Sequence, residues 1–378
     1  MEFAFDHTLT RLRERGRDIA RTEVEPSVVL RDQTATWDTQ IFNALAKVGL
    51  AGVLLPAGKG GLGLTVLQAV AFLEGFGEGG GDAGLALATG VHGLLCGVPI
   101  ATLGTRAQRD RYLADIASGE SLWGMALSEL DGGANDAGAG VTASRTPDGW
   151  QLDGARSHVI NAPYANCFLV TADVGGGERT AFLVERDTPG LAVAPEPETS
   201  SLRTAPSGGL VLTQCLVGPD AVLGTRGAAA TELVPLLAGL DRTCLLAPWL
   251  GILRAVAEHT RRLVTELPRL GGQLVRSQTV RMAVVDMWTD VELGADLLYR
   301  AAWQLGQPSG TPRQDTAVAK LFLTRALREA TRTATGFAGL APDHLVERAY
   351  RDVLGLAAIG GGEDLLRAVV AGALLELG

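Results

Sequence analysis

The sequence predicts a mostly helical α+β protein in which a small β-barrel or sandwich lies between two helical regions. Three observations indicate this class. Helical periodicity dominates residues 1–120 and again residues 226–378, whereas residues 121–225 hold short β-type runs separated by turn residues. The chain of 378 residues is also too long for one small core. We therefore expect an N-terminal helical domain, a central β domain and a C-terminal four-helix bundle over these three ranges.

The N-terminal region contains amphipathic helical segments and a glycine-rich loop. Arg11–Val24 is charged and amphipathic, and Trp37–Val48 repeats apolar residues at helical spacing and ends at Gly49. The loop Pro56–Gly63 lacks the Lys-Ser/Thr pair of a phosphate-binding loop, which favours a turn between helices. Ala83–Thr105 is the longest uncharged run. Because five glycines and a proline interrupt it, we expect a buried helix pair and not a membrane span.

The central region has the pattern of a small sheet. Leu122–Ser128 is a short apolar run that ends in polar residues and a Gly-rich turn. The triplet Pro147-Asp148-Gly149 is a strong turn signal between two runs of strand type, so it predicts a hairpin. The further strands are expected at Val141–Arg145, Trp150–Asp153, Phe168–Thr171, Ala181–Glu185 and Gly209–Gln214.

The C-terminal region returns to long helical segments joined by glycine-containing turns. The first segment, Ala228–Leu267, is nearly continuous and is interrupted near Gly239 and Pro248. Long segments with short connections are typical of an antiparallel four-helix bundle. The other helices are expected at Gln278–Gln304, Asp315–Ala334, Leu345–Leu356 and Glu363–Leu377.

Composition excludes several functional classes. The net charge of −9 argues against nucleic acid or an anionic membrane as the main partner. Hydrophobic residues make up 47% and charged residues 20%, which suits sizeable cores and not a disordered chain. The four cysteines are widely spaced without a CxxC motif, so reduced, buried thiols in a cytoplasmic protein are expected. The five histidines lack metal-ligand spacing, so no metal site is expected.

Several stretches of the chain carry a family resemblance. Leu127–Glu129 precedes a Gly-rich turn, and Asp153–Asn166 follows as a strand pair. Leu250–Ala255 lies in the first expected bundle helix and Ala283–Thr289 in the second, and His344–Arg367 contains an Arg-Asp pair before a glycine run. Together with the order of the regions, these stretches resemble the acyl-CoA dehydrogenase family. His344–Arg367 closely resembles dehydrogenases of polyketide clusters that act on carrier-protein-bound extender units.

The resemblance implies an activity, a cofactor and an assembly. Members of this family bind FAD between the β domain and the bundle, and they remove the α-proton and β-hydride of an acyl thioester. A carboxylate takes the proton, and a backbone N–H polarises the thioester oxygen. The implied substrate is an acyl thioester on CoA or on an acyl carrier protein. The implied assembly is a homodimer or homotetramer formed through the bundle.

The catalytic residues of the family fall on unusual residues in this chain. The usual glutamate aligns with Gly360, which has no side chain to act as a base but has an N–H that suits the thioester oxygen. In some relatives the base lies at the start of the first bundle helix, which aligns with Asp241, followed by Arg242 as a substrate-side residue. Aspartate is about 1.5 Å shorter in reach than glutamate. Alternatively, Asp241 pairs with Arg242 or caps the helix, and the Gly360 run is only a turn.

The resemblance also assigns the cofactor contacts, several of which are changed. His158 stands where the family has a flavin-facing Trp, and Ile160 replaces a Thr that hydrogen-bonds near the flavin. Thr333 and Gly362 likewise replace polar residues of the family, and Leu267 and Leu270 replace residues that reach a neighbouring subunit's FAD. His158 is alternatively a surface or hydrogen-bonded histidine. The candidate FAD-binding residues are Leu127, Ser128, Gly133, His158, Ile160, Gln278, Gly336 and Gly361.

Three functional hypotheses follow from this mixture of retained and lost residues. The first is a flavin-dependent acyl-thioester dehydrogenase of secondary metabolism, with Asp241 as the base. The second is a protein of the same fold that has lost FAD and serves as a non-redox catalyst or as a partner subunit. The third keeps the flavin but reacts it with oxygen.

Overall fold

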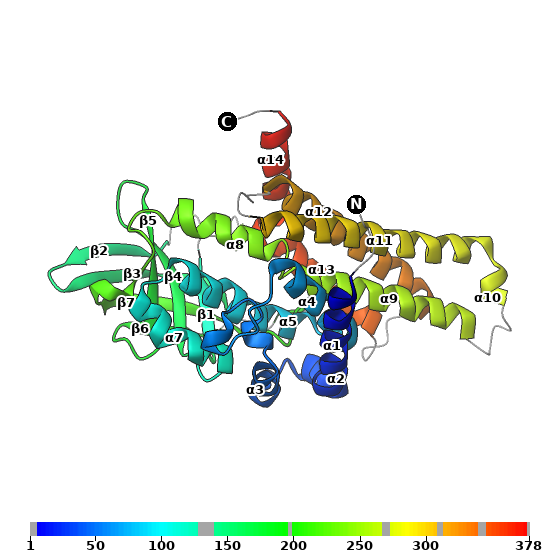
Figure 1. Ribbon diagram of the computed structural model, residues 1–378, viewed down its shortest axis with the longest axis horizontal. Helices are drawn as coiled ribbons and strands as arrows, with labels where there is room; N and C mark the ends of the chain where they lie inside the picture. The colour runs from blue at the N-terminus through cyan, green and yellow to red at the C-terminus, as the bar shows by residue number, and fades with distance from the viewer. Residues whose placement is uncertain are drawn as a thin grey trace.

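A computed structural model gives the arrangement of the chain in space, and it describes residues 6–127, 140–195, 199–266, 273–307, 313–338 and 345–375. Figure 1 shows a twisted sheet at one end, long helices at the other, and the N-terminal helices between and beneath them. The mostly helical α+β class predicted from the sequence is therefore confirmed.

The N-terminal region is built from short and medium helices that pack by close backbone approach. A Cβ atom on Gly75 would collide with the backbone of Arg13, so glycine lets helix α4 lie directly against helix α1. The predicted glycine-rich turn contains only a 3₁₀ turn, Ala57–Lys59. The helices of this region are α1 (His7–Glu23), α2 (Glu25–Thr34), α3 (Thr39–Lys47), α4 (Val66–Gly80) and α7 (Arg106–Ser118).

The long apolar run forms one continuous helix, so the expectation of a helix pair is wrong. It comprises α5 (Ala83–Gly90), a π-helical stretch η3 (Val91–Gly97) and α6 (Val98–Leu103), with right-handed helical backbone at both junctions. Its glycines do not break it, because tertiary packing outweighs their low helix propensity. It is the one described helix that is apolar and long enough to cross a membrane, and 94% of its apolar window is buried inside the protein.

His92 on this helix fixes the start of the sheet. Its Nδ1 accepts a hydrogen bond from the Trp123 N–H at 3.2 Å, and its Nε2 lies 2.9 Å from the Ile116 carbonyl oxygen. Complete burial lowers the pKa of His92 to about 4, so the ring stays neutral and can accept the bond from Trp123.

The central region forms one strongly curved sheet with strand order β6-β7-β3-β2-β4-β5-β8, and β1 pairs in parallel with β4. The predicted hairpin is present: β2 and β3 are antiparallel, with Thr146 opposite Gly149. The register of β3 against β7 shifts between Arg156 and Val159, which marks a bulge. The strands are β1 (Trp123–Ala126), β2 (Thr142–Thr146), β3 (Gly149–Ile160), β4 (Cys167–Asp173), β5 (Arg179–Glu185), β6 (Leu191–Ala194), β7 (Ser207–Val217) and β8 (Val222–Leu223).

The C-terminal helices form the second half of the molecule. The first expected segment is broken at residues 242–246, between Gly239 and Pro248, so it gives a short helix and a long one. Figure 1 shows α9, α11 and α12 side by side, with α14 extending away from the body. The helices are α8 (Val234–Asp241), α9 (Ala247–Glu266), α10 (Gln273–Arg276), α11 (Gln278–Leu305), α12 (Arg313–Ala338), α13 (Leu345–Ala358) and α14 (Gly362–Leu374).

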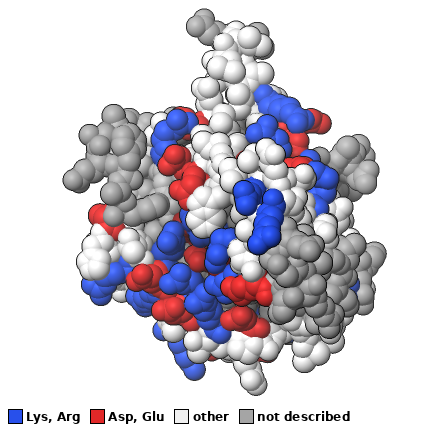
Figure 2. Space-filling view, turned by 90° about the vertical axis from the view of Figure 1, so that its right-hand side faces the viewer, with Lys and Arg blue, Asp and Glu red and all other residues white. Residues whose placement is uncertain are grey.

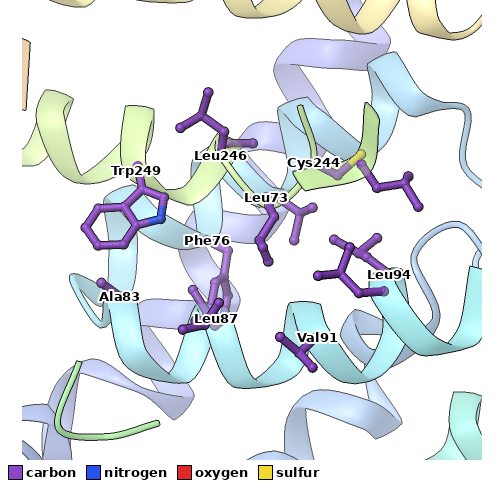
Figure 3. Packing of buried hydrophobic residues seen from close by; sticks show 14 of the residues in the cluster. Leu73, Phe76, Ala83, Leu87, Val91, Leu94, Cys244, Leu246 and Trp249 are labelled. Atoms are coloured by element: carbon purple, nitrogen blue, oxygen red, sulfur yellow. The ribbon is translucent and has the colours of Figure 1, made fainter. Parts of the chain in front are cut away.

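A hydrophobic core joins the N-terminal helices to the break between α8 and α9. Figure 3 shows Leu73 and Phe76 of α4 close to Leu87 of α5. Cys244 and Leu246, which come just before α9, lie on the other side of the same cluster. Cys244 is completely buried, and so is its neighbour Leu246. Burial of Cys244 and Leu246 holds the segment between α8 and α9 in place. The C-terminal end of α8, which comes directly before this segment, is therefore held in place as well.

The face at the end of the long helices carries charges of both signs. Figure 2 shows Lys and Arg side chains interspersed with Asp and Glu on this face. Helix α9 itself carries such a mixture, because its Glu258 pairs with Arg261 at 2.7 Å and with Arg262 at 2.8 Å. Such exposed pairs contribute little to stability, and their mixture creates no extended field of one sign.

Helix α13 is held by a buried polar junction. The Asp352 carboxylate accepts a 2.6 Å hydrogen bond from the Leu202 N–H, and its neighbour Arg351 pairs with Asp32 of α2 at 2.6 Å. Burial raises the pKa of Asp352 to about 7, although the Leu202 N–H and Arg351 act in the opposite direction. Asp32 and Asp82 add repulsion that raises it further.

This raised pKa predicts a pH-dependent stability. Between about pH 4 and pH 7 the unfolded chain loses the Asp352 proton first, so the free energy of unfolding falls as pH rises, by up to about 4 kcal/mol. The Asp352→Asn variant lacks this titration, and its stability should change less with pH over the same window. Denaturant unfolding of both proteins across that range measures the difference, and equal slopes would contradict the prediction.

Candidate active site

Asp241 is the last residue of α8, and its carboxylate is buried against a lysine of α12. Asp241 is 5% exposed and Lys320 is 2% exposed. The Lys320 Nζ lies 2.7 Å from Asp241 Oδ2 and donates a second hydrogen bond to the Ile359 carbonyl oxygen at 3.0 Å. The direct ion pair of Asp241 is thus with Lys320, and its alternative partner Arg242 interacts with it through charge alone. The lysine ties α8, α12 and the end of α13 together at one point.

Gly360 lies directly on this ion pair. Its backbone has φ +71°, a left-handed conformation that favours glycine. A Cβ atom at this position would lie 2.5 Å from Asp241 Oδ2 and 2.5 Å from Lys320 Nζ. The space that a side chain of residue 360 would need is thus taken by the carboxylate of residue 241. The structure brings together the two residues that the sequence singled out as catalytic candidates.

Lys320 was missed by the sequence analysis, although a signal was present. It lies on a helix face whose other positions, Thr316, Leu323 and Leu327, are buried. A lysine on an apolar helical stripe is almost never fully buried unless it is paired. The position therefore indicated a buried acidic partner, but not which one.

The second carboxylate oxygen of Asp241, Oδ1, is not held by Lys320. Within the described part of the chain, Oδ2 takes the hydrogen bond from Lys320, and Oδ1 accepts none. A carboxylate with one oxygen held and the other available is suited to accept a proton from a bound molecule. Thr316, one helical turn before Lys320, lines an adjoining pocket of about 540 Å³ together with Gly239, Leu240 and Arg242.

The candidate residues for a flavin ring lie on the strands β1 and β3. Leu127 follows β1 and is buried. His158 lies within the bulge of β3 with φ +56°, and its side chain is exposed. Ile160 ends the strand and is half-buried. A non-glycine residue in the left-handed region costs energy, and such residues concentrate at functional sites. Ser128 and Gly133 lie outside the described residues.

The candidates for the nucleotide half of the cofactor lie on α11 and α12. Gln278 and Thr333 line one groove of about 540 Å³ between these helices. Gly336 lies about one turn after Thr333, and a Cβ atom there would meet nothing within 4 Å. The groove also contains carboxylates, Asp286, Asp290 and Glu329, of which Glu329 pairs with Arg332. Gly361 follows Gly360 in the turn, and Leu267 and Leu270 lie outside the described residues.

Thiol and metal chemistry find little support in the described residues. All four cysteines are free and buried. Burial raises the pKa of each thiol, which keeps it protonated and unreactive. Within the described ranges, no group of three His, Cys, Asp or Glu side chains is placed to hold a metal ion.

Comparisons with known proteins agree with this architecture. The models of the acyl-CoA dehydrogenase N-terminal, middle and C-terminal domains match residues 6–120, 124–215 and 237–375. The L-prolyl-[peptidyl-carrier protein] dehydrogenase of Pseudomonas fluorescens is 28% identical, over 86% of this chain and 87% of that protein.

Solved structures show the same fold over nearly the whole chain. The prolyl acyl carrier protein oxidase AnaB is 25% identical with a TM-score of 0.91, covering 98% of this chain and 100% of its own. Butyryl-CoA dehydrogenase from Megasphaera elsdenii is 25% identical with a TM-score of 0.90, covering 99% of this chain and 100% of its own. With three domain models matched in order along its length, the chain belongs to the acyl-CoA dehydrogenase family.

Proposed function

We propose that the protein is a flavin-dependent dehydrogenase of acyl thioesters in secondary metabolism, with Asp241 as the catalytic base. The observation that carries this proposal is the position of the Asp241 carboxylate, which occupies the space next to Gly360. The base is then supplied from α8, and the turn after α13 supplies backbone only. The similarity to a peptidyl-carrier protein dehydrogenase and to an acyl carrier protein oxidase supports a thioester substrate, on CoA or on a carrier protein.

The residues present fit a flavin ring beside β3. The bulge exposes His158, whose flat ring suits contact with another ring, and Ile160 adds an apolar surface. When bound, FAD accepts the β-hydride of the substrate. Leu127, Ser128 and Gly133 would hold the ring through backbone groups. Gln278, Gly336 and Gly361 would hold the nucleotide, in part on a neighbouring subunit.

The chain's own residues account for the removal of the proton. Asp241 takes the α-proton, and Lys320 holds Oδ2 so that the carboxylate keeps one orientation. The Gly360 N–H donates to the thioester oxygen and stabilises the negative charge that develops there. The absent side chain at residue 360 leaves its space to the Asp241 carboxylate, which can therefore lie beside the Gly360 backbone.

The experiment that tests this function is inspection of the purified protein for flavin, followed by anaerobic addition of an acyl thioester. We expect about one FAD per chain and bleaching of its visible absorption as the thioester is oxidised. A protein that neither retains nor binds added FAD would exclude the dehydrogenase.

The second candidate function is that of an FAD-free catalyst or partner subunit, and the α11–α12 groove favours it. Asp286 and Asp290 lie in the groove that Gln278 and Thr333 share, and carboxylates repel a pyrophosphate.

We therefore expect the Asp290→Asn variant to bind FAD about 2- to 5-fold more tightly. Burial raises the pKa of Asp290, so the affinity of the unmodified protein should also rise as pH falls. Titration of flavin fluorescence at several pH values measures both effects, and unchanged affinity would contradict them.

Helix α11 also supports the proposed homo-oligomer. Met282, Val285 and Trp288 are 50%, 53% and 41% exposed on one side of this helix. Such an apolar stripe is typical of a surface that another chain covers. A homodimer or homotetramer is expected on size-exclusion chromatography, and a monomer at all concentrations would contradict it.

A further inference from the structure

A buried arginine lies next to Asp241, and the carboxylate of that residue is shared with Lys320. Arg242 is 4% exposed, and its Nε is buried without a hydrogen-bond partner. Within the described ranges, the guanidinium makes no hydrogen bond or ion pair. The carboxylate beside it in sequence, Asp241, is already bound by Lys320. Asp241 therefore offsets only part of the positive charge of Arg242 and Lys320, and an anion from outside the chain would offset the rest.

Arg242 lines a pocket that is suited to an anion at the end of an aliphatic chain. The pocket has a volume of about 540 Å³, and its two ionisable lining residues in the described part of the chain are Arg242 and Arg313. Burial lowers the pKa of Arg242, Asp241 raises it, and Arg313 adds repulsion that lowers it. Apart from two threonines and two glycines, the other walls are apolar: Leu54, Leu64, Val98, Leu236, Leu240 and Leu305 among them.

The pocket is bordered by the N-terminal end of α12 and the C-terminal end of α8, whose dipoles have opposite signs. Arg313 and Thr316 belong to the first turn of α12, whose positive dipole end attracts anions. Gly239 and Leu240 belong to the C-terminal end of α8, which attracts the guanidinium but offers it no hydrogen bond. The pocket therefore presents two guanidinium groups and a helix N-terminus to its contents.

We propose that Arg242 and Arg313 bind a carboxylate at the far end of the acyl chain whose thioester end lies at Asp241. This inference rests on the proposed function, because it places the acyl chain in the pocket that adjoins Asp241. A guanidinium fork matches a carboxylate with two parallel hydrogen bonds, and the apolar walls match the methylene groups between. The substrate class is thus an ω-carboxyacyl thioester.

The test compares matched pairs of small thioesters that carry no phosphate. The probes are S-acyl-N-acetylcysteamines with ω-carboxylated chains of four, five and six carbons, each beside a neutral chain of equal carbon number. Binding is measured by calorimetry, and flavin bleaching is measured separately. We expect at least one carboxylated probe to bind about 10- to 100-fold more tightly than its neutral counterpart. Free 4′-phosphopantetheine is a further arm, which distinguishes a phosphate from an acyl carboxylate as the bound anion.

The variants make the result specific to the two arginines. Arg313→Gln changes an exposed side chain and should remove most of the preference without unfolding the protein. Arg242→Gln should remove the rest, and its folding is checked by circular dichroism. Arg21→Gln is the control, because Arg21 is an exposed arginine on α1 and does not line the pocket. Its preference should match that of the unmodified protein.

The outcomes separate this inference from the function on which it rests. Equal binding of charged and neutral probes, binding of phosphopantetheine alone, or a preference that survives both Arg242→Gln and Arg313→Gln would overturn the carboxylate site. If neutral thioesters bleach the flavin as fast as charged ones, the dehydrogenase stands without this site. If charged probes bind through the arginines but no probe bleaches a flavin, the site stands and the dehydrogenase fails.

Discussion

Replacing Lys320 with methionine is expected to lower the free energy of unfolding by about 3–5 kcal/mol. Lys320 and Asp241 are both buried, and their charged groups are 2.7 Å apart. Methionine fills a similar volume but leaves the Asp241 carboxylate and the Ile359 carbonyl oxygen without their donor. An unpaired buried charge is far more costly than the pair is favourable. Chemical denaturation of the two proteins at pH 7 measures the difference.

A second substitution shows whether the loss comes from the unpaired charge. In the Asp241→Asn/Lys320→Met double variant no charge is stranded, so much of the stability should return. Lys47→Met is the matched control, because Lys47 is exposed at the end of α3, and it should change stability by less than about 0.5 kcal/mol. A loss below about 1 kcal/mol for Lys320→Met would show that the pair does not form in solution.

Replacing Asp241 with asparagine is expected to slow exchange of the thioester α-proton by about 10²- to 10⁴-fold. Asparagine keeps the shape of the side chain but cannot accept the proton as a base. Its amide oxygen can still accept the hydrogen bond from Lys320, and the candidate FAD contacts are on other elements. The FAD content should therefore be unchanged, which separates loss of chemistry from loss of cofactor.

The measurement is incorporation of solvent deuterium at the α-carbon, followed by mass spectrometry, beside the rate of dehydrogenation. Asp18→Asn, an exposed substitution on α1, is the control and should leave both rates as they are. If Asp241→Asn exchanges the α-proton at the original rate, Asp241 is not the base.

Local patterns predicted the fold well, because they report on single elements. The turn triplet located the β2–β3 hairpin, and helical periodicity located α11 and α12. Single-element patterns failed where packing decided the outcome. The glycines of the apolar run suggested a break, but a Cβ atom on Gly93 would collide with the backbone of Ala51, so the glycine serves close packing within one helix. The strands β6 and β8 are too short to give an alternating pattern.

The candidate site was predictable only in part, for the same reason. Asp241 was found through a resemblance, since its own neighbours in sequence give no chemical signal. Lys320 pairs with it across 79 positions of the chain, and no local pattern records such a distance. Likewise, no local pattern shows that Lys320 binds the carboxylate next to Arg242, or that the Arg242 Nε has no hydrogen-bond partner.

The geometry at Gly360 also limits which sequences this chain can reach by single steps. A glutamate introduced there would meet the Asp241 carboxylate and the Lys320 ammonium group at the first carbon of its side chain, on a backbone with φ +71°. A glutamate at residue 360, where the resemblance places the family's usual acid, would therefore displace the Asp241–Lys320 pair and strain the backbone. The residues at positions 241, 320 and 360 therefore depend on one another, and a change at one of them alters what the other two can be.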